Sequence, residues 1–227
     1  MANQQEIATG TRRHRDLIHN ALTDESLSRG LRFLSERDED LARILRDLGP
    51  PPMWPREPGF PALIHTILEQ KISLASAGAV FQRLLAIATP LTPHKFLSLE
   101  EDALRAIGFS GRKIIYGRHL SAAIVEGRLD LESLNTLDDE GVRAELLKIK
   151  GIGLWTADIY LLRSLRRQDI WPVGDLALAV AVQRVKRLPS RPSPNELEQM
   201  SAPWRPWRAI AARILWSYYL SGPKKLA

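Results

Sequence analysis

The stretch LKIKGIGLWTA, residues 147–157, sets two glycines one residue apart between two segments whose apolar residues recur with helical spacing. Glycine at positions 151 and 153 lets the backbone turn sharply and approach a ligand closely, because no Cβ stands in the way. Ile152 is expected to point into the groove between the two helices. Such a hairpin presents backbone N–H groups and the positive end of the second helix, which suits it to binding a phosphate.

A carboxylate follows this hairpin in the segment PVGDL, residues 172–176. Gly-Asp before an apolar run is typical of a helix N-cap, so Asp175 is expected to cap the helix that begins at Leu176. The same carboxylate is the candidate for chemistry on the molecule to which the phosphate belongs. Asp158 and Asp169 are interpreted as solvated or capping residues. The pairing of hairpin and carboxylate indicates an enzyme that acts on DNA.

The composition of the chain limits the kinds of partner and site that this hypothesis allows. The chain has 227 residues, 44% of them hydrophobic, with a net charge of +6 and a pI near 9.8, which favours a polyanionic partner. It has no cysteine, which excludes disulfides, thiolate zinc sites and a cysteine-held iron–sulfur cluster. The polar amino terminus does not resemble a signal peptide, and no apolar run is long enough for a membrane helix. We expect a monomer in the cytoplasm, associated with the nucleoid.

The hydrophobic pattern is helical almost throughout, and the predicted fold class is all-α. Proline-rich loops interrupt it at residues 49–61 and 188–194. Helices are expected at residues 27–48, 61–88, 99–107, 112–126, 139–149, 154–166, 176–186 and 204–220.

Residues 147–157 together with Asp175 resemble the helix-hairpin-helix DNA glycosylases, in particular the 3-methyladenine DNA glycosylase II family. The resemblance extends to ILEQKIS, residues 67–73, which is similar to the family's Gln-x-x-Ser helix, and to PWR, residues 206–208, followed by Trp216. It implies two helical lobes with a cleft between them, forming one glycosylase unit over residues 1–227. Residues 61–188 would form the central lobe with the hairpin, and residues 1–60 with 189–227 the second lobe. The first fifty residues match nothing in the family.

The resemblance implies a monofunctional DNA glycosylase of base-excision repair. It would flip an alkylated purine, such as 3-methyladenine or 7-methylguanine, out of double-stranded DNA and hydrolyse its N-glycosidic bond without a cofactor. Asp175 would stabilise the oxocarbenium-like sugar and assist the attack of water. Related enzymes that also cut the DNA backbone place a lysine where this chain has Trp155, so no lyase activity is expected.

The remaining site residues are assigned partly from the resemblance. Trp155 and Trp216 would form the base pocket, because the face of an indole attracts a cationic base; Trp54 and Phe60 are further candidates. The hairpin backbone at Gly151, Ile152 and Gly153 would hold DNA phosphates. The side-chain candidates for DNA contact are Lys148, Lys150, Arg112, Lys113, Gln70 and Lys71. Lys71 occupies the family's wedge position, where a lysine is a departure. The family's hairpin carbonyls can hold potassium or sodium, here near Lys148, Lys150 and Gly153.

Two alternatives remain open at this point. The chain could be a non-catalytic helix-hairpin-helix module that binds DNA, although Asp175 and the aromatic residues argue against that. It could also be a glycosylase for mismatched or oxidised bases. Many of those enzymes hold an iron–sulfur cluster on four cysteines, which this chain lacks, but some have no cluster.

Overall fold

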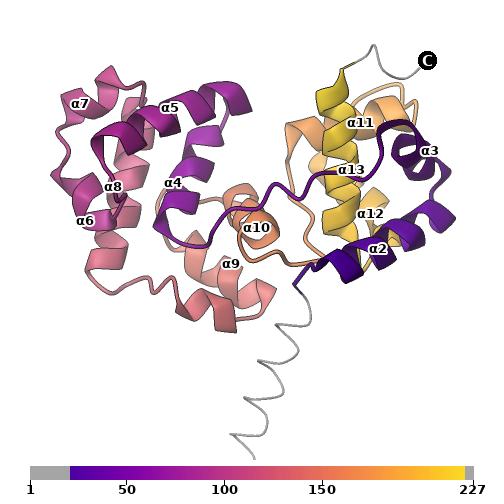
Figure 1. Ribbon diagram of the computed structural model, residues 1–227, viewed down its shortest axis with the longest axis horizontal. Helices are drawn as coiled ribbons and strands as arrows, with labels where there is room; N and C mark the ends of the chain where they lie inside the picture. Colours follow the sequence, from indigo (N-terminus) through magenta and orange to yellow (C-terminus); the bar gives the residue numbers. More distant parts are fainter. Residues whose placement is uncertain (1–20, 223–227) are drawn as a thin grey trace, which may run out of the picture. The chain divides into compact units, whose positions relative to one another are not determined.

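The computed structural model describes residues 21–222, and within this range no strand is present apart from a single bridge between Ala21 and Arg167. The expected all-α class is confirmed (Figure 1). The chain forms two compact units, one built from residues 56–165 and the other from the segments on either side of it. We call these unit 2 and unit 1. No described helix is long and apolar enough to cross a membrane.

Unit 2 is a continuous stretch of chain. Its helices are α4 (Phe60–Glu69), α5 (Leu74–Ile87), α6 (Pro93–Ser98), α7 (Glu101–Ala106), α8 (Gly111–Val125), the 3-10 turn η1 (Ser133–Thr136), α9 (Asp139–Leu147) and α10 (Leu154–Arg163). Helix α4 packs against α5, α8 and α10, and α8 packs against α6. The core therefore surrounds α4, on which eight of ten residues are buried.

Unit 1 is built from two separated segments. Its helices are α2 (Asp24–Arg37), α3 (Glu39–Leu48), α11 (Leu176–Val185), α12 (Pro194–Ser201), the 3-10 turn η2 (Ala202–Trp204) and α13 (Arg208–Ser221). Helix α13, yellow in Figure 1, packs against α2, α3 and α11. Nine consecutive residues of α13, from Arg208 to Trp216, are buried, so this helix forms the centre of unit 1.

The boundary between the units differs from the expected one. The sequence placed residues 166–188 in the central lobe with the hairpin, whereas in the structure the residues from Arg166 onward belong to unit 1. Helix α11 packs on α13, and Asp175, which caps α11, therefore belongs to unit 1 together with that helix. The first twenty residues, among those that match nothing in the family, lie outside the described range.

Two expected helices are each broken in two. Asp38 divides the predicted helix 27–48, because its side chain accepts hydrogen bonds from Asp40 N and Leu41 N and caps α3. The predicted helix 61–88 is interrupted at residues 70–73, where Lys71 adopts a φ of 60° and Ser73 caps α5. The expected end at Gly49 is confirmed, with a φ of 74° at that residue.

Candidate active site

The hairpin joins α9 to α10 as the sequence predicts. Gly151 has a φ of 96°, and a Cβ at this position would collide with the ring of Tyr116. Ile152 is buried, while Gly153 is exposed and precedes the first turn of α10 with no side-chain cap. Together these features leave the amino-terminal end of α10 without a competing side chain, the arrangement expected of an anion site.

A buried ion pair ties the two hairpin helices together. Asp158 on α10 is 1% exposed and accepts a hydrogen bond from Arg143 Nε on α9 at 2.7 Å. The interpretation of Asp158 as a solvated or capping residue was therefore wrong, because its carboxylate joins the helices. Asp169 is also engaged: its Oδ1 accepts from Arg208 Nε at 2.8 Å.

The end of α4 and the turn after it are held at three successive residues, Leu68, Glu69 and Gln70. Buried Lys113 donates from Nζ to the carbonyl of Leu68 at 2.6 Å, and burial lowers the pKa of this lysine. Buried Glu69 accepts from Arg56 Nη1 and Arg163 Nη1, each at 3.1 Å. Burial alone would raise the pKa of Glu69, but the hydrogen bond from Arg56 and the charges of both arginines lower it.

Gln70 connects this turn to the hairpin. Its Nε2 donates to the carbonyl of Gly151 at 2.9 Å and to Thr156 Oγ1 at 3.0 Å. Lys71, the next residue, is exposed and has a left-handed backbone, and the apolar side chains of Ile72 and Leu74 beside it are also exposed. The turn therefore presents Lys71 outward from a base that is fixed to the hairpin.

In unit 1, Asp175 caps α11 as the sequence predicts. Its Oδ1 accepts from the backbone N–H of Leu178 at 2.9 Å and from Trp216 Nε1 at 3.2 Å. Asp175 is 7% exposed and Trp216 is 6% exposed. The carboxylate is thus oriented by one backbone donor and one indole donor before any ligand arrives.

The predicted aromatic residues divide between the units. Trp54 packs edge-to-face on Trp216, with ring centroids 6.4 Å apart and an interplanar angle of 69°. Trp155 is partly exposed on the first turn of α10 in unit 2. Phe60 is a core residue of unit 2: it is 4% exposed and packs edge-to-face on Phe96. Its ring is occupied by core packing, so we leave it out of the candidate base pocket.

The predicted DNA-contacting lysines have different surroundings. Lys148 and Lys150 are exposed at the hairpin, and Lys148 also pairs with Glu145 at 2.7 Å. Arg112 is exposed on α8. Lys113 is buried and donates to the carbonyl of Leu68, so its side chain is not a candidate for contact with a phosphate. Nothing in the sequence pattern distinguishes these two neighbours, because only packing in unit 2 buries one of them.

The expected cation at the hairpin stays a prediction. The carbonyl of Gly153 accepts the first hydrogen bond of α10 from Ala157 N at 3.1 Å, so this oxygen points along the helix. Among the described residues, no group of three or more His, Cys, Asp or Glu side chains could hold a metal ion.

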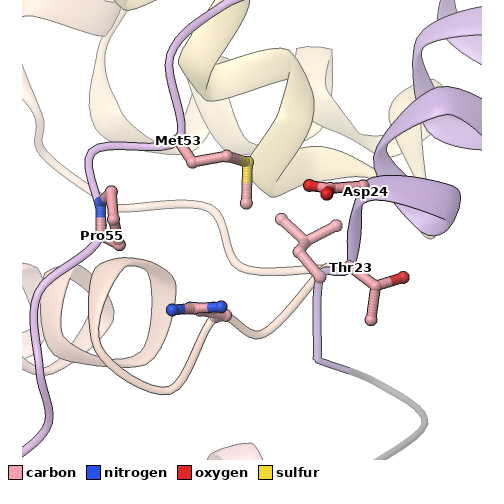
Figure 2. Close-up of a pocket in the computed structure, with 6 residues that line it drawn as sticks. Thr23, Asp24, Met53 and Pro55 are labelled. Atoms are coloured by element: carbon pink, nitrogen blue, oxygen red, sulfur yellow. The ribbon is translucent and has the colours of Figure 1, made fainter.

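Unit 1 also contains a pocket that the sequence did not predict. It has a volume of about 420 Å³ and is lined by Leu22, Thr23, Asp24, Met53, Pro55 and Arg166. Figure 2 shows Met53 and Pro55 on the segment between α3 and α4, and Thr23 and Asp24 at the start of α2. None of the six is a predicted site residue, although Met53 and Pro55 flank Trp54.

Comparison with known proteins decides the family. Residues 64–206 match the family described as HhH-GPD superfamily base excision DNA repair protein. This chain belongs to that superfamily. It is 30% identical over 198 residues to a Schizosaccharomyces pombe protein named DNA-3-methyladenine glycosylase 1, covering 84% of this chain and 87% of that protein.

Solved structures agree with this assignment. A Schizosaccharomyces pombe 3-methyladenine DNA glycosylase in complex with abasic DNA superimposes with a TM-score of 0.79 at 30% identity, covering 83% of this chain and 95% of that one. A DNA-3-methyladenine glycosidase from Bacillus halodurans gives a TM-score of 0.66 at 28% identity, over 82% and 87% of the two chains. The predicted superfamily and fold are confirmed.

Proposed function

We propose that this HhH-GPD protein is a DNA-3-methyladenine glycosylase of base-excision repair, which hydrolyses the N-glycosidic bond of alkylated purines in double-stranded DNA. The observation that carries the proposal is the buried carboxylate of Asp175, held by Leu178 N and Trp216 Nε1. Relatives named as 3-methyladenine glycosylases, at 26–30% identity, support the choice of substrate class.

The chemistry follows from the charge that develops on the sugar. As the glycosidic bond breaks, positive charge grows on the deoxyribose ring, and a fixed carboxylate stabilises it without reorganisation. Asp175 would supply the negative charge of that carboxylate and accept the proton of the attacking water. A purine alkylated at N3 or N7 is cationic and leaves as a neutral base, so the bond breaks without a strong general acid.

Access to the bond requires the nucleotide to leave the stack. The hairpin at 151–153 would hold a phosphate near the lesion, and Lys71 would enter the space that the flipped nucleotide vacates. A lysine fills this space less completely than an apolar side chain, but its ammonium group can donate to the unpaired base or to a phosphate. Gln70 fixes Lys71 relative to the hairpin in unit 2.

Base release from methylated duplex DNA tests the catalytic assignment. Asp175→Asn keeps an oxygen that can accept from Leu178 N and Trp216 Nε1, so the cap and the fold are retained while the charge is lost. We expect release of 3-methyladenine and 7-methylguanine to slow by roughly 100-fold or more. Equal rates for the wild type and Asp175→Asn would reject Asp175 as the catalytic group.

A substrate panel separates the alternatives. Release of 3-methyladenine and 7-methylguanine, with little or no release of 8-oxoguanine or uracil, is expected. The opposite preference would identify an enzyme for oxidised or mismatched bases, and no release at all would indicate a DNA-binding module.

Because Trp155 carries no amine, borohydride should trap no covalent enzyme–DNA adduct; a trapped adduct would contradict the proposed monofunctional mechanism.

A further inference from the structure

Lys113 lies on the first turn of α8, at a place that two physical effects disfavour for a cation. The residue is only 9% exposed, and its burial lowers the pKa of the side chain. It is also the third residue of a helix that Ser110 caps, so it lies at the positive end of that helix's dipole. A cation in such a place needs a partner that compensates for both effects.

That partner is the carboxyl-terminal end of α4. The Nζ of Lys113 donates to the carbonyl of Leu68 at 2.6 Å, one residue before the helix ends. A cation bonded to one of the last carbonyls of a helix stabilises its negative end. Lys71 follows shortly after with a φ of 60°, which is uncommon for a residue with a Cβ and persists only where the surrounding structure holds it. Lys113 therefore caps α4 from a neighbouring helix, immediately before this turn.

Tyr116, on the same helix, lies against the hairpin. A Cβ at Gly151 would stand 2.1 Å from Cγ of the Tyr116 ring, so the hairpin backbone approaches this ring closely. Lys113 and Tyr116 are three residues apart and are neighbours on the surface of α8. The helix is itself closely packed, because a Cβ at Gly117 would collide with the ring of Phe96. Helix α8 thus contacts both the end of α4 and the hairpin.

We propose that Lys113 is a positioning residue for base flipping. It holds the end of α4 on α8, the helix that also supports the hairpin, and so fixes where Lys71 stands relative to Gly151. This inference rests on the proposed function, in which Lys71 enters the space that the flipped nucleotide vacates. A side chain that is in place before DNA binds loses less conformational freedom on entering that space. Lys113 is buried, so it acts through the turn and not on DNA itself.

The variant Lys113→Met tests this role. Methionine keeps a flexible apolar side chain of similar length but has neither the donor nor the charge, so the end of α4 loses its cap. The measurement is single-turnover excision of 7-methylguanine opposite cytosine, because flipping this base breaks an intact pair. We expect Lys113→Met to be slower than the wild type by roughly 10-fold on that duplex.

A second duplex separates positioning from a simple loss of folded protein. A 7-methylguanine opposite adenine is mismatched, so it leaves the stack at a lower cost and depends less on a side chain that fills the gap. The loss in Lys113→Met should therefore shrink to about 2-fold on the mismatched duplex. A smaller fraction of folded protein would instead slow excision from both duplexes by the same factor. Equal losses on the two duplexes, or no loss on either, overturn the inference.

Lys186→Met is the matched control. Lys186 belongs to unit 1, whereas the turn and the hairpin belong to unit 2, and its Nζ donates to Asp38 Oδ1 at 2.8 Å. The substitution removes a lysine hydrogen bond of the same kind, so the Tm should fall while the ratio of excision rates on the two duplexes stays that of the wild type. The same change of ratio in both variants would overturn the inference.

Lys113→Gln provides the comparison if Lys113→Met does not fold. Its amide can donate to a carbonyl without burying a charge, but its shorter side chain reaches less far. We expect Lys113→Gln to slow excision opposite cytosine more than excision opposite adenine. Equal slowing on the two duplexes would count against the positioning role for this variant as well.

Coupling to Lys71 identifies the route of the effect. In the background of Lys71→Ala, adding Lys113→Met should slow excision opposite cytosine by less than about 2-fold, because the side chain to be positioned is absent. Effects that multiply in the double variant, or a wild-type rate for Lys71→Ala alone, would overturn the inference. Failure of the wild type to release 7-methylguanine from either duplex would instead reject the proposed function.

Discussion

At the scale of single residues, the two glycines of the hairpin, Gly151 and Gly153, have different roles. Gly151 is required by its φ of 96° and by the ring of Tyr116, which leaves no room for a Cβ. Gly153 has a φ of −99°, and a Cβ there would meet nothing within 4 Å. The first glycine is therefore needed for folding, and we propose that the second is needed for the approach of a ligand.

Alanine at each position tests this distinction. Gly151→Ala should lower the free energy of unfolding by several kcal/mol, because both the backbone and Tyr116 must shift. Gly153→Ala should keep the wild-type Tm but weaken DNA binding, since its Cβ stands where a phosphate would approach the backbone. Thermal melts and fluorescence-anisotropy titrations of both variants decide the matter. Equal losses of stability in the two variants would contradict it.

Residue-level prediction from sequence succeeded where the local pattern itself dictates the role. The capping role of Asp175 follows from Gly-Asp before an apolar run, and the structure confirms it. The burial of Lys113 and Phe60 could not be predicted in the same way, because each depends on a group far away in the chain: the backbone carbonyl of Leu68 for Lys113 and the ring of Phe96 for Phe60. The left-handed backbone of Trp54, whose φ is 43°, has no sequence signal either.

At the scale of elements, hydrophobic periodicity located the helices but not their breaks. Apolar spacing continues through Asp38 and through residues 70–73, so one pattern covered two helices in each case. Capping residues were the available signal, with Asp38 before α3 and Ser73 before α5. No helix was predicted over residues 195–201 of α12, although Ser193 and Glu196 form a capping box around Pro194.

Helices α4 and α5 are joined by a histidine whose ionisation should be visible in stability. His65 stacks on Phe81, with ring centroids 4.2 Å apart and an interplanar angle of 8°. Burial, together with the positive charges of Arg56 and Arg163, lowers the pKa of His65 from 6.5 to about 4, against the opposing charge of Glu69. The folded protein therefore resists protonation of a ring that the unfolded chain protonates readily.

The sign of the pH dependence follows from linkage. As the pH falls from 6.5 towards 4, the unfolded chain binds a proton that the folded protein does not, so the free energy of unfolding falls, by up to about 3 kcal/mol from this group. Urea denaturation between pH 6.5 and 5 measures it, above the range in which Glu69 and Asp38 protonate.

A phenylalanine at this position provides the comparison. His65→Phe keeps the stacked ring and removes the titration, so most of the slope between pH 6.5 and 5 should disappear. His119→Gln, a substitution at an exposed histidine of α8, should leave the slope unchanged. The same slope in His65→Phe as in the wild type would assign the effect to other groups.

At the scale of the whole molecule, the net charge of +6 should make DNA binding depend strongly on salt. Affinity for a duplex falls with salt in proportion to the number of phosphates neutralised, and this number does not depend on the lesion. We therefore expect parallel plots of log affinity against log salt for alkylated and undamaged duplexes. Clearly different slopes would mean that lesion recognition adds or removes phosphate contacts.

Two lysines of equal charge locate the phosphate contacts. Lys150→Ala at the hairpin should reduce the salt slope by about 1, whereas Lys95→Ala on α6 should leave it unchanged, although both substitutions remove one positive charge. Identical slopes in the two variants would indicate that the hairpin lysine contributes only to the general field of the protein.

The division into units has a consequence for synthesis on the ribosome. Unit 2 is a continuous insertion, and a hydrogen bond from Arg56 N to the carbonyl of Arg163 joins the two ends of its chain. It can fold as soon as residue 165 has emerged, whereas unit 1 must wait for α13, the last described helix. A nascent or prematurely terminated chain would thus contain a folded hairpin, the proposed DNA contact, before Asp175 reaches its folded position. Only the finished translation product would then release a base.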